Sequence, residues 1–411
     1  MPYANCLLTR HNAGIIPGGA LALWDASGRR YVLGERAANR ILIHEDPSLT
    51  RSDRAEVIAT VMGLAPEVDL ADPRFIQFLD VVLDVTTGDT LEPSPELVIP
   101  NVIPHAWNPA AHDARVEEFL ESISCGCEST LALIEEMLGA AVYRGRIPYI
   151  WVVVGVAPVE GGDASNGKST LCAIAVKLVG RANSAELDVH DLGRNFMTAS
   201  LLGALLDVSS DTSSAPIPPS ALSILKRIPT QDVLMADVKY AQPVRFRPYA
   251  TMVIAANRVP GFVVDAGLKR RTRVIPLRGH FEEGGADPAV ELDNEECMSA
   301  LVVHAVAGLR RLLGQGPTAS EDGEASLGSL VALSSSVAQW VDDRDVSAKW
   351  LEGRACSATY RGYADWCADA GTQALPKGEF ERELPTVVPG VSVRKCRHKG
   401  SAPTRRWMPA S

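Results

Sequence analysis

The sequence predicts an α/β protein organised around one glycine-containing loop, and three observations support this. An apolar, β-branched run at residues 149–156 is typical of a parallel strand buried on both faces. A loop with the spacing G-x-x-x-x-G-K-[ST] follows at Gly162–Thr170. Apolar residues then recur at helical spacing from Leu171 to Leu178. Strand, loop and helix in this order are the context in which such a loop cradles phosphate groups.

The spacing of the loop predicts its chemistry. Glycines let successive backbone N–H groups point at phosphate oxygens, and the start of the next helix adds partial positive charge. Lys168 is expected to reach the β- and γ-phosphates of a nucleotide, and the Ser169 hydroxyl to ligate Mg²⁺. An ordinary glycine-rich turn is the alternative, and Asp163 places a carboxylate beside the expected phosphates. The candidate nucleotide-binding residues are Gly162, Ser165, Asn166, Gly167, Lys168, Ser169 and Thr170.

Length and composition narrow the class of protein. A chain of 411 residues is expected to hold two or three domains, and 46% hydrophobic with 22% charged residues is typical of a soluble globular protein. The net charge of −10 argues against a protein that binds nucleic acid over most of its surface, although it allows a local cationic patch. No apolar run approaches the roughly 20 residues of a membrane helix, and no signal peptide is recognised. We therefore expect a cytoplasmic protein.

The eight cysteines are scattered, and only Cys125 and Cys127 lie close together. No C-x-x-C pair is present to combine with histidines or with a second pair. This pattern favours reduced thiols over zinc or disulfides.

The order of elements suggests five parts. Short strand-like pieces and a helix form a small α+β N-terminal domain, and a proline-rich linker (93–109) precedes a helical collar. Further apolar strands at 204–209, 250–256 and 272–277 alternate with helices, which predicts a mainly parallel sheet. Helices followed by two strand-like pieces suggest a C-terminal winged helix. The expected boundaries are 1–100, 101–148 (linker and collar), 149–285 (core), 286–330 (helix and linker) and 331–411.

Polar residues follow two of the expected core strands. Asp211 ends an apolar strand, as a residue that holds Mg²⁺ or polarises the attacking water does in a phosphate-loop enzyme. Asp207 is the weaker candidate for this role, and an acidic turn is the alternative. Asn257 ends the neighbouring strand, where an amide can orient water or sense the γ-phosphate. It can equally start the turn before Pro260.

A basic segment precedes the last expected strand of the core. Arg270 and Arg271 are candidates for a group that stabilises transition-state charge at the active site of a neighbouring subunit. A solvated basic turn is the alternative interpretation.

The order of these motifs resembles a known family. Residues 166–170, 209–211, 226–232 with 239–240, 255–260 and 270–276 in succession look like the helicase region of phage and plasmid primase-helicases. These are superfamily 3 helicases with an AAA+-type P-loop ATPase core, related to the poxvirus primase-helicase. Residues 80–91 resemble the family's N-terminal segment, and 336–411 its winged helix.

The resemblance implies roles for several residues. Asp211 would be the second acidic motif, Asn257 the sensor, and Arg270 or Arg271 an arginine finger acting across a subunit interface, which implies a ring, usually a hexamer. Lys226, Lys239 and Tyr240 lie in the region of the pore hairpin that contacts single-stranded DNA. The chain departs from the family at Thr230-Gln231, at Ala236-Asp237, and in having aspartate at position 211, where glutamate is commoner.

The C-terminal tail is rich in cations. On a winged-helix wing these side chains would grip phosphates, while a third helix carrying Lys377 and Arg382 could enter a groove of DNA. That helix also carries Glu379, Glu381 and Glu383, which favours the wing as the DNA contact. An unengaged basic tail is the alternative. The candidate DNA-binding residues of the tail are Arg394, Lys395, Arg397, Lys399, Arg405 and Arg406.

Together these features predict an ATP-dependent, ring-forming DNA helicase that uses ATP and Mg²⁺ in replication of a phage or mobile element. Its expected partners are single-stranded and forked DNA, further copies of itself and a separate primase, in the bacterial host cytoplasm. Two alternatives remain. One is an ATP-switched initiator or loader on duplex DNA, and the other is a degenerate ATPase that serves as a scaffold.

Overall fold

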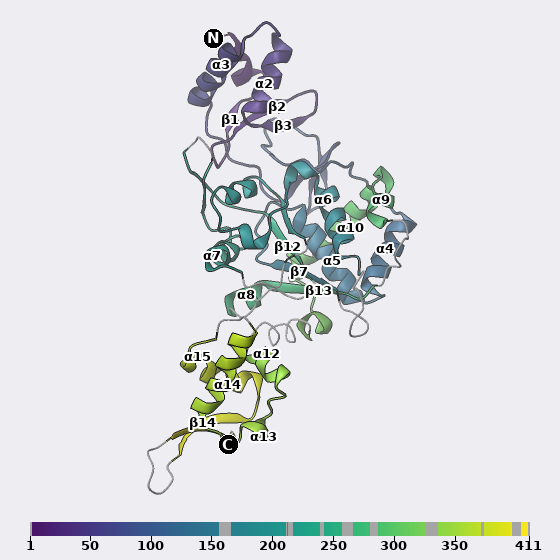
Figure 1. Cartoon of the computed structure of the whole chain (residues 1–411). Helices are drawn as coiled ribbons and strands as arrows, with labels where there is room; N and C mark the ends of the chain where they lie inside the picture. The colour runs from purple at the N-terminus through teal and green to yellow at the C-terminus, as the bar shows by residue number, and fades with distance from the viewer. Residues whose placement is uncertain are drawn as a thin grey trace. The chain divides into compact units, whose positions relative to one another are not determined.

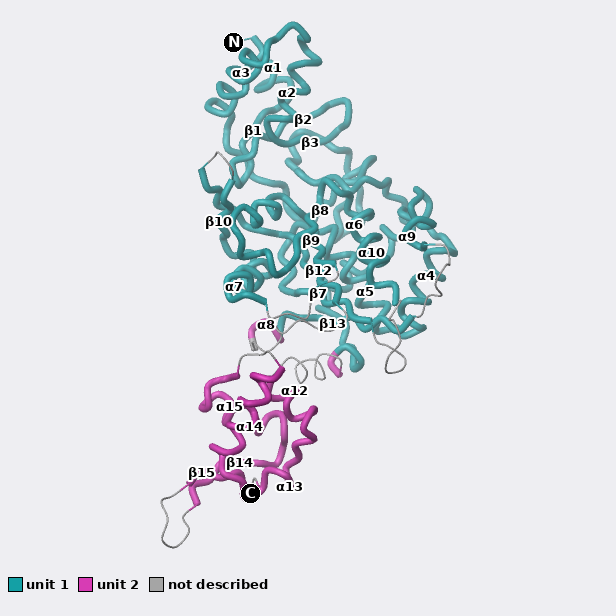
Figure 2. The backbone as a smooth tube through the Cα atoms, viewed as in Figure 1, with its two compact units in different colours: residues 1–258, 270–323 teal, residues 259–269, 324–411 magenta. Residues whose placement is uncertain are grey.

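The computed structural model describes residues 2–155, 166–210, 212, 217–238, 242–256, 266–279, 287–325, 336–370, 374–396 and 404–409. The chain forms two compact units, coloured separately in Figure 2. The first comprises Met1–Arg258 and Arg270–Gly323, and the second Val259–Lys269 and Glu324–Ser411.

A parallel five-stranded sheet lies at the centre of the first unit (Figure 1). Its strand order is β13-β7-β12-β9-β8, so β7 lies between β12 and β13. The expected strands at 149–156, 204–209, 250–256 and 272–277 are confirmed, and so is their parallel pairing. Continuous apolar runs form these strands because helices cover the sheet. The strands are β7 (Ile150–Gly155), β8 (Ser184–Ala185), β9 (Leu206–Ser209), β12 (Thr251–Ala256) and β13 (Thr272–Leu277).

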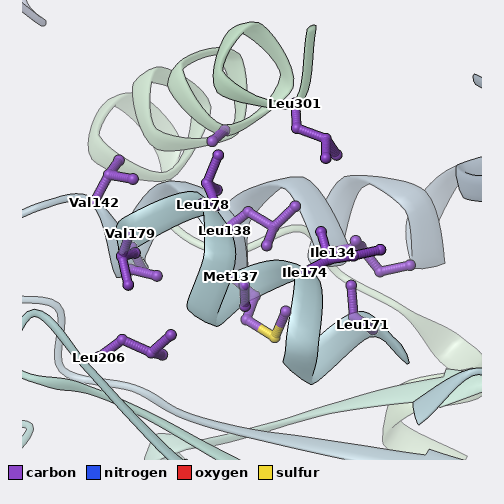
Figure 3. Packing of buried hydrophobic residues seen from close by; sticks show 14 of the residues in the cluster. Ile134, Met137, Leu138, Val142, Leu171, Ile174, Leu178, Val179, Leu206 and Leu301 are labelled. Atoms are coloured by element: carbon purple, nitrogen blue, oxygen red, sulfur yellow. The ribbon is translucent and has the colours of Figure 1, made fainter. Parts of the chain in front are cut away.

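Four helices build the main hydrophobic core with this sheet. They are α4 (Ala114–Ser124), α5 (Glu128–Ala141), α6 (Lys168–Val179) and α10 (Glu295–Gln315). Figure 3 shows Met137 of α5 near Ile174 of α6, with Leu301 contributed by α10. The helices expected as a separate collar therefore share one core with the sheet, because Ile134 and Met137 are fully buried in it.

Helices α5 and α10 approach each other closely through two glycines. A β-carbon on Gly308 would lie 2.2 Å from the carbonyl of Glu135, and one on Gly139 would lie 2.4 Å from the Ala305 oxygen. Such distances are too short for any side chain. By length and mean hydropathy (1.3) α10 could cross a membrane, but 61% of that stretch is buried. Packing in the core accounts for its apolar composition.

A network of charged groups joins the same helices. His304 of α10 contacts Glu135 through Nδ1 at 2.8 Å and Glu117 through Nε2 at 2.9 Å. The hydrogen bond to Glu135 is the main reason that the pKa of His304 is raised. Arg311 donates to Glu135 and to the fully buried Glu136, each at 2.9 Å. The charges thus pair with each other where α4, α5 and α10 meet.

The N-terminal residues form three helices and two small antiparallel sheets; the first sheet and its helices are purple in Figure 1, whereas Ile76 and Leu83 of the second sheet belong to the main core. Leu7, Leu23, Leu42 and Val61 form a separate apolar cluster here. The helices are α1 (Pro2–Thr9), α2 (Gly34–Glu45) and α3 (Arg51–Leu64). The strands are β1 (Gly14–Ile15), β2 (Leu21–Asp25), β3 (Arg30–Leu33), β4 (Phe75–Gln77), β5 (Val82–Asp84) and β6 (Thr90–Leu91).

The proline-rich span 93–109, which was expected to be a linker, is instead packed against the core. Ile99 and Ile103 are each 1% exposed. The Asn101 amide donates to Asn183 Oδ1 and to the Gly203 carbonyl, both at 2.9 Å, and its oxygen accepts from the Tyr249 hydroxyl at 3.0 Å. The prolines exclude regular structure, while side chains that the pattern does not reveal fix the span against the core.

The second unit consists of helices followed by a hairpin, which is the expected order of elements. Its core is aromatic: Phe380 stacks on Tyr363 at 4.6 Å between ring centroids and meets Trp340 and Trp407 edge-on. The elements are α12 (Ser336–Asp343), α13 (Ala348–Leu351), α14 (Cys356–Asp369), α15 (Lys377–Val387), β14 (Val391–Cys396) and β15 (Thr404–Pro409).

Because the α5–α10 contact leaves no room for a β-carbon, we expect Gly308→Ala to lower the free energy of unfolding by about 2–3 kcal/mol. The matched control is Gly314→Ala in the same helix, where a β-carbon meets nothing within 4 Å. That change should be neutral or stabilise by up to about 1 kcal/mol, because alanine favours helix. Urea denaturation of both variants tests this, and equal stabilities would refute the close approach.

Candidate functional site

Helix α6 begins directly after the last glycine of the predicted phosphate loop. Gly167 caps the helix with φ 77° and ψ 11°, a left-handed conformation that suits glycine, and its carbonyl accepts from the Leu171 N–H at 2.8 Å. Lys168, Ser169 and Thr170 form the first turn. Backbone N–H groups in a first turn are not bonded within their own helix, so this end favours an anion.

The end of β7 lies against the same turn. A β-carbon on Gly155 would be 2.6 Å from Lys168 Nζ and 2.1 Å from Asn166 Oδ1. The Asn166 amide donates to the Gly279 carbonyl, just after β13, at 2.8 Å. Glycine at 155 therefore lets the lysine approach the strand end. The sequence analysis did not single out Gly155, although its place at the end of an apolar strand is a usable signal.

Four of the predicted residues of this site, Gly162, Ser165, Asp211 and Asn257, lie outside the described residues. The strands that precede the last two are described. β9 ends at Ser209 and β12 at Ala256, and both run parallel to β7. The carboxyl ends of these strands therefore share one edge of the sheet with the start of α6, and ligands of open α/β sheets bind at such an edge.

Asp207, the weaker acidic candidate, is fully buried in β9. Its Oδ1 accepts from the Leu187 N–H at 3.0 Å, and burial raises its pKa to about 7. Ser209, two residues later, is also buried, and its hydroxyl accepts from the Val189 N–H at 3.0 Å. Both side chains bind the backbone beside β8, so Asp207 has no access to a metal ion at the sheet edge.

Arg270 and Arg271 lie at the opposite edge of the sheet from Lys168. They end helix α8 (Ala266–Arg271), which runs directly into the amino end of β13. In the parallel pairing of β13 with β7, Thr272 lies opposite Ile150 and Leu277 opposite Gly155. The strand length separates the two edges by about 17 Å. Arg270 is exposed and Arg271 half-buried.

A β-hairpin occupies the region of the predicted pore contact. β10 (Leu234–Ala236) pairs antiparallel with β11 (Val244–Phe246), and Lys239 and Tyr240 fall between the strands but outside the described residues. Lys226 lies in the last turn of α7 (Pro219–Arg227), before the hairpin. The shorter remaining elements are η1 (Arg181–Asn183), η2 (Val189–Asp191), η3 (Met197–Leu201) and α9 (Pro288–Glu291).

The sequence analysis missed two exposed arginines of this hairpin. Arg245 pairs across the strands with Met235, which is 52% exposed. Arg247 is exposed as well, and its guanidinium donates to the Gln231 carbonyl at 3.0 Å. The sequence offered one signal for them. Arg245 and Arg247 flank Phe246, and because alternate residues of a strand face the same side, a buried Phe246 predicts that both arginines face outward.

The cations of the C-terminal tail divide into two groups. Arg394 and Lys395 are exposed on β14, whereas Arg397 and Lys399 lie outside the described residues. Arg405 Nη1 is 2.7 Å from Glu381, whose side chain is 4% exposed. Arg406 donates to the Gly353 carbonyl at 2.5 Å.

Arg405 and Arg406 therefore contribute to the fold of this unit. The pairing with Arg405 also removes Glu381 from the surface acids expected on the third helix.

Asp207 makes stability depend on pH. Its folded pKa, near 7, lies above the ordinary value of 3.8, so its protonated form favours the folded chain at low pH and this contribution is lost as pH rises toward 7. We expect Asp207→Asn to be more stable, relative to the parent, at pH 8 than at pH 5 by about 3 kcal/mol. Urea midpoints at both pH values test this, with exposed Asp69→Asn as the control. The same difference at both pH values would contradict it.

Comparisons with known proteins give two family matches and one fold. Residues 15–125 match the family described as "D5 N terminal like", and residues 159–271 match a family of unknown function, DUF5906. No curated protein matches the chain.

Among solved structures, the A-form apo structure of the NrS-1 C terminal region has a TM-score of 0.52 at 13% identity, covering 99% of both chains. A second apo structure of that region (305–718) gives the same TM-score and identity, covering 99% of this chain and 98% of the other. At this identity the likeness shows a shared fold. Together with the two family matches, it fits the phage primase-helicase family.

Proposed function

We propose that the chain is an ATP-dependent, ring-forming DNA helicase of superfamily 3 that acts in replication of a phage or mobile element. The observation that carries this proposal is the separation of Lys168 and the Arg270/Arg271 pair at opposite edges of one sheet. About 17 Å of strand prevents the arginines from reaching the nucleotide of their own subunit. They are suited instead to a nucleotide held by a neighbour, and such head-to-tail contacts close into rings.

The start of α6 supports ATP and Mg²⁺ as the ligands. The first-turn N–H groups and Lys168 would hold the phosphates, and Ser169, which is exposed, would ligate the metal. Asp211 and Asn257 would complete the site from the ends of β9 and β12. The parallel sheet, in which the loop strand β7 lies between β13 and β12, supports the AAA+-type P-loop core.

DNA contact in the ring is assigned to the hairpin of β10 and β11. Lys239 and Tyr240 would track the backbone and stack on a base, and Arg245 adds an exposed cation on the same hairpin. Translocation along single-stranded DNA then requires the hairpins of successive subunits to move with the state of their nucleotide.

An ATP-switched initiator on duplex DNA is a second candidate, and the second unit favours it. The order of helices and hairpin supports a winged helix, and Arg394 and Lys395 are exposed on β14, where they could contact phosphates.

A shared ATP site predicts complementation between two inactive variants. Lys168→Ala should lose nucleotide binding, and the double variant Arg270→Ala/Arg271→Ala should bind ATP but hydrolyse it about 10³-fold more slowly. Mixed in equal amounts, the two should regain activity, because roughly a quarter of interfaces then combine an intact lysine with an intact arginine pair. Steady-state ATPase assays measure this, and a mixture as inactive as its components would exclude the shared site.

Stimulation by DNA separates the two candidate functions. A translocating helicase should hydrolyse ATP faster with single-stranded DNA, and Arg245→Ala should weaken that stimulation while leaving the rate without DNA unchanged. The matched control is Arg51→Ala, a change of an exposed arginine at the start of α3. Stimulation by duplex DNA alone, with no effect of Arg245→Ala, would reject the helicase and favour the initiator.

A further inference from the structure

We propose that Cys6, His11 and Glu45 form a zinc-binding site in the N-terminal part of the chain. The thiol, an imidazole nitrogen and a carboxylate oxygen of these residues all lie within 4.8 Å of one another. They come from α1, from the turn after it and from the last position of α2. The site does not depend on the proposed helicase function.

Trp24 holds His11 in the orientation that a metal ligand needs. The Trp24 N–H donates to the His11 carbonyl at 2.6 Å, and His11 Nδ1 lies 2.9 Å from the Trp24 carbonyl oxygen. A carbonyl can only accept a hydrogen bond, so Nδ1 carries the proton and Nε2 presents a lone pair. This arrangement, with one ring nitrogen bonded to a backbone carbonyl and the other left for the metal, is the usual one for histidine ligands.

The Nε2 atom is buried and has no hydrogen-bond partner within the described part of the chain. A buried hydrogen-bond acceptor without a partner is energetically unfavourable, and an ion bound to it is a recognised explanation for such an atom. The contact of Nδ1 with the Trp24 carbonyl holds the ring, and Nε2 is shielded from solvent. A metal bound between Nε2, the thiol and the carboxylate would satisfy it.

The turn after α1 brings Cys6 and His11 together. The N–H groups of Arg10 and His11 both donate to the Cys6 carbonyl, at 2.9 and 3.3 Å, so the chain folds back beside the cysteine. Glu45 closes the site from the end of α2. A bound ion would therefore cross-link α1 and α2 around β2.

The donor set selects the metal. A thiolate, an imidazole and a carboxylate are ligands that zinc uses, whereas Mg²⁺ and Ca²⁺ prefer oxygen alone. Three protein ligands leave a fourth, tetrahedral position for water. Because the three donor atoms lie within 4.8 Å of one another, rotation of the Cys6 and Glu45 side chains suffices to bring them to a common centre with the His11 nitrogen.

A cation already lies at this cluster. Arg10 Nη1 is 3.1 Å from Glu45 Oε2 and 3.8 Å from Cys6 Sγ, and the Arg10 side chain is 69% exposed. The guanidinium balances the charge of the carboxylate and, being exposed, can move away when a metal binds. Arg10 thus competes with zinc for Glu45 and Cys6. Removal of Arg10 should therefore strengthen zinc binding, whereas removal of a ligand should weaken it.

Metal content of the full chain tests the proposal. After treatment with a chelator, reloading with zinc and dialysis, we expect one tightly held zinc ion per chain, and Co²⁺ in its place should give a thiolate charge-transfer band. Cys6→Ser and His11→Gln should each weaken zinc binding more than about 100-fold, the upper end for loss of an outer-shell partner. Cys125→Ser and His44→Gln, changes of the same types at exposed positions, should leave it unchanged.

Two further measurements keep the test independent of folding. Zinc should raise the Tm of the parent but not that of His11→Gln, since a ligand stabilises only the state that binds it. Arg10→Ala should bind zinc more tightly than the parent, because the competing cation is gone. No retained zinc in the parent, or retained zinc that survives both Cys6→Ser and His11→Gln, would overturn the assignment.

Discussion

The pairing of β7 with β12 on one side and β13 on the other determines where the candidate residues of the core lie. Parallel strands place all their carboxyl ends at one edge, so the start of α6 and the ends of β9 and β12 meet there. The same pairing carries Arg270 and Arg271 to the other edge. The separation of Lys168 from the arginine pair therefore follows from strand direction.

Much of the core could be predicted from the sequence because its signals are local. A β-branched run before Gly155 and glycine with lysine at 167 and 168 specify a strand and a helix start through nearby residues. The features that were missed depend on contacts between distant segments. The proline-rich span is held against the core by a hydrogen bond from Asn101 to Asn183, and no pattern within either segment reveals that contact.

The roles of charged side chains were similarly hard to predict from the sequence. Six cations in a short span predicted a DNA-binding wing, yet Arg405 pairs with Glu381, twenty-four residues earlier, and Arg406 bonds a backbone carbonyl. Counting charges cannot separate a side chain that binds a partner from one that satisfies a buried acid. Cys6, His11 and Glu45 were overlooked for a related reason, because their spacing matches no metal motif and only the fold brings them together.

The glycine contact between α5 and α10 has a mechanical consequence. With two helix backbones touching and a paired network of charges alongside, the helices have little room to slide or tilt past each other. The two helices therefore form a rigid pair packed against the sheet. Any displacement of the strand ends would pass to α4, α5 and α10 as movement of one body, so bending would concentrate outside these helices.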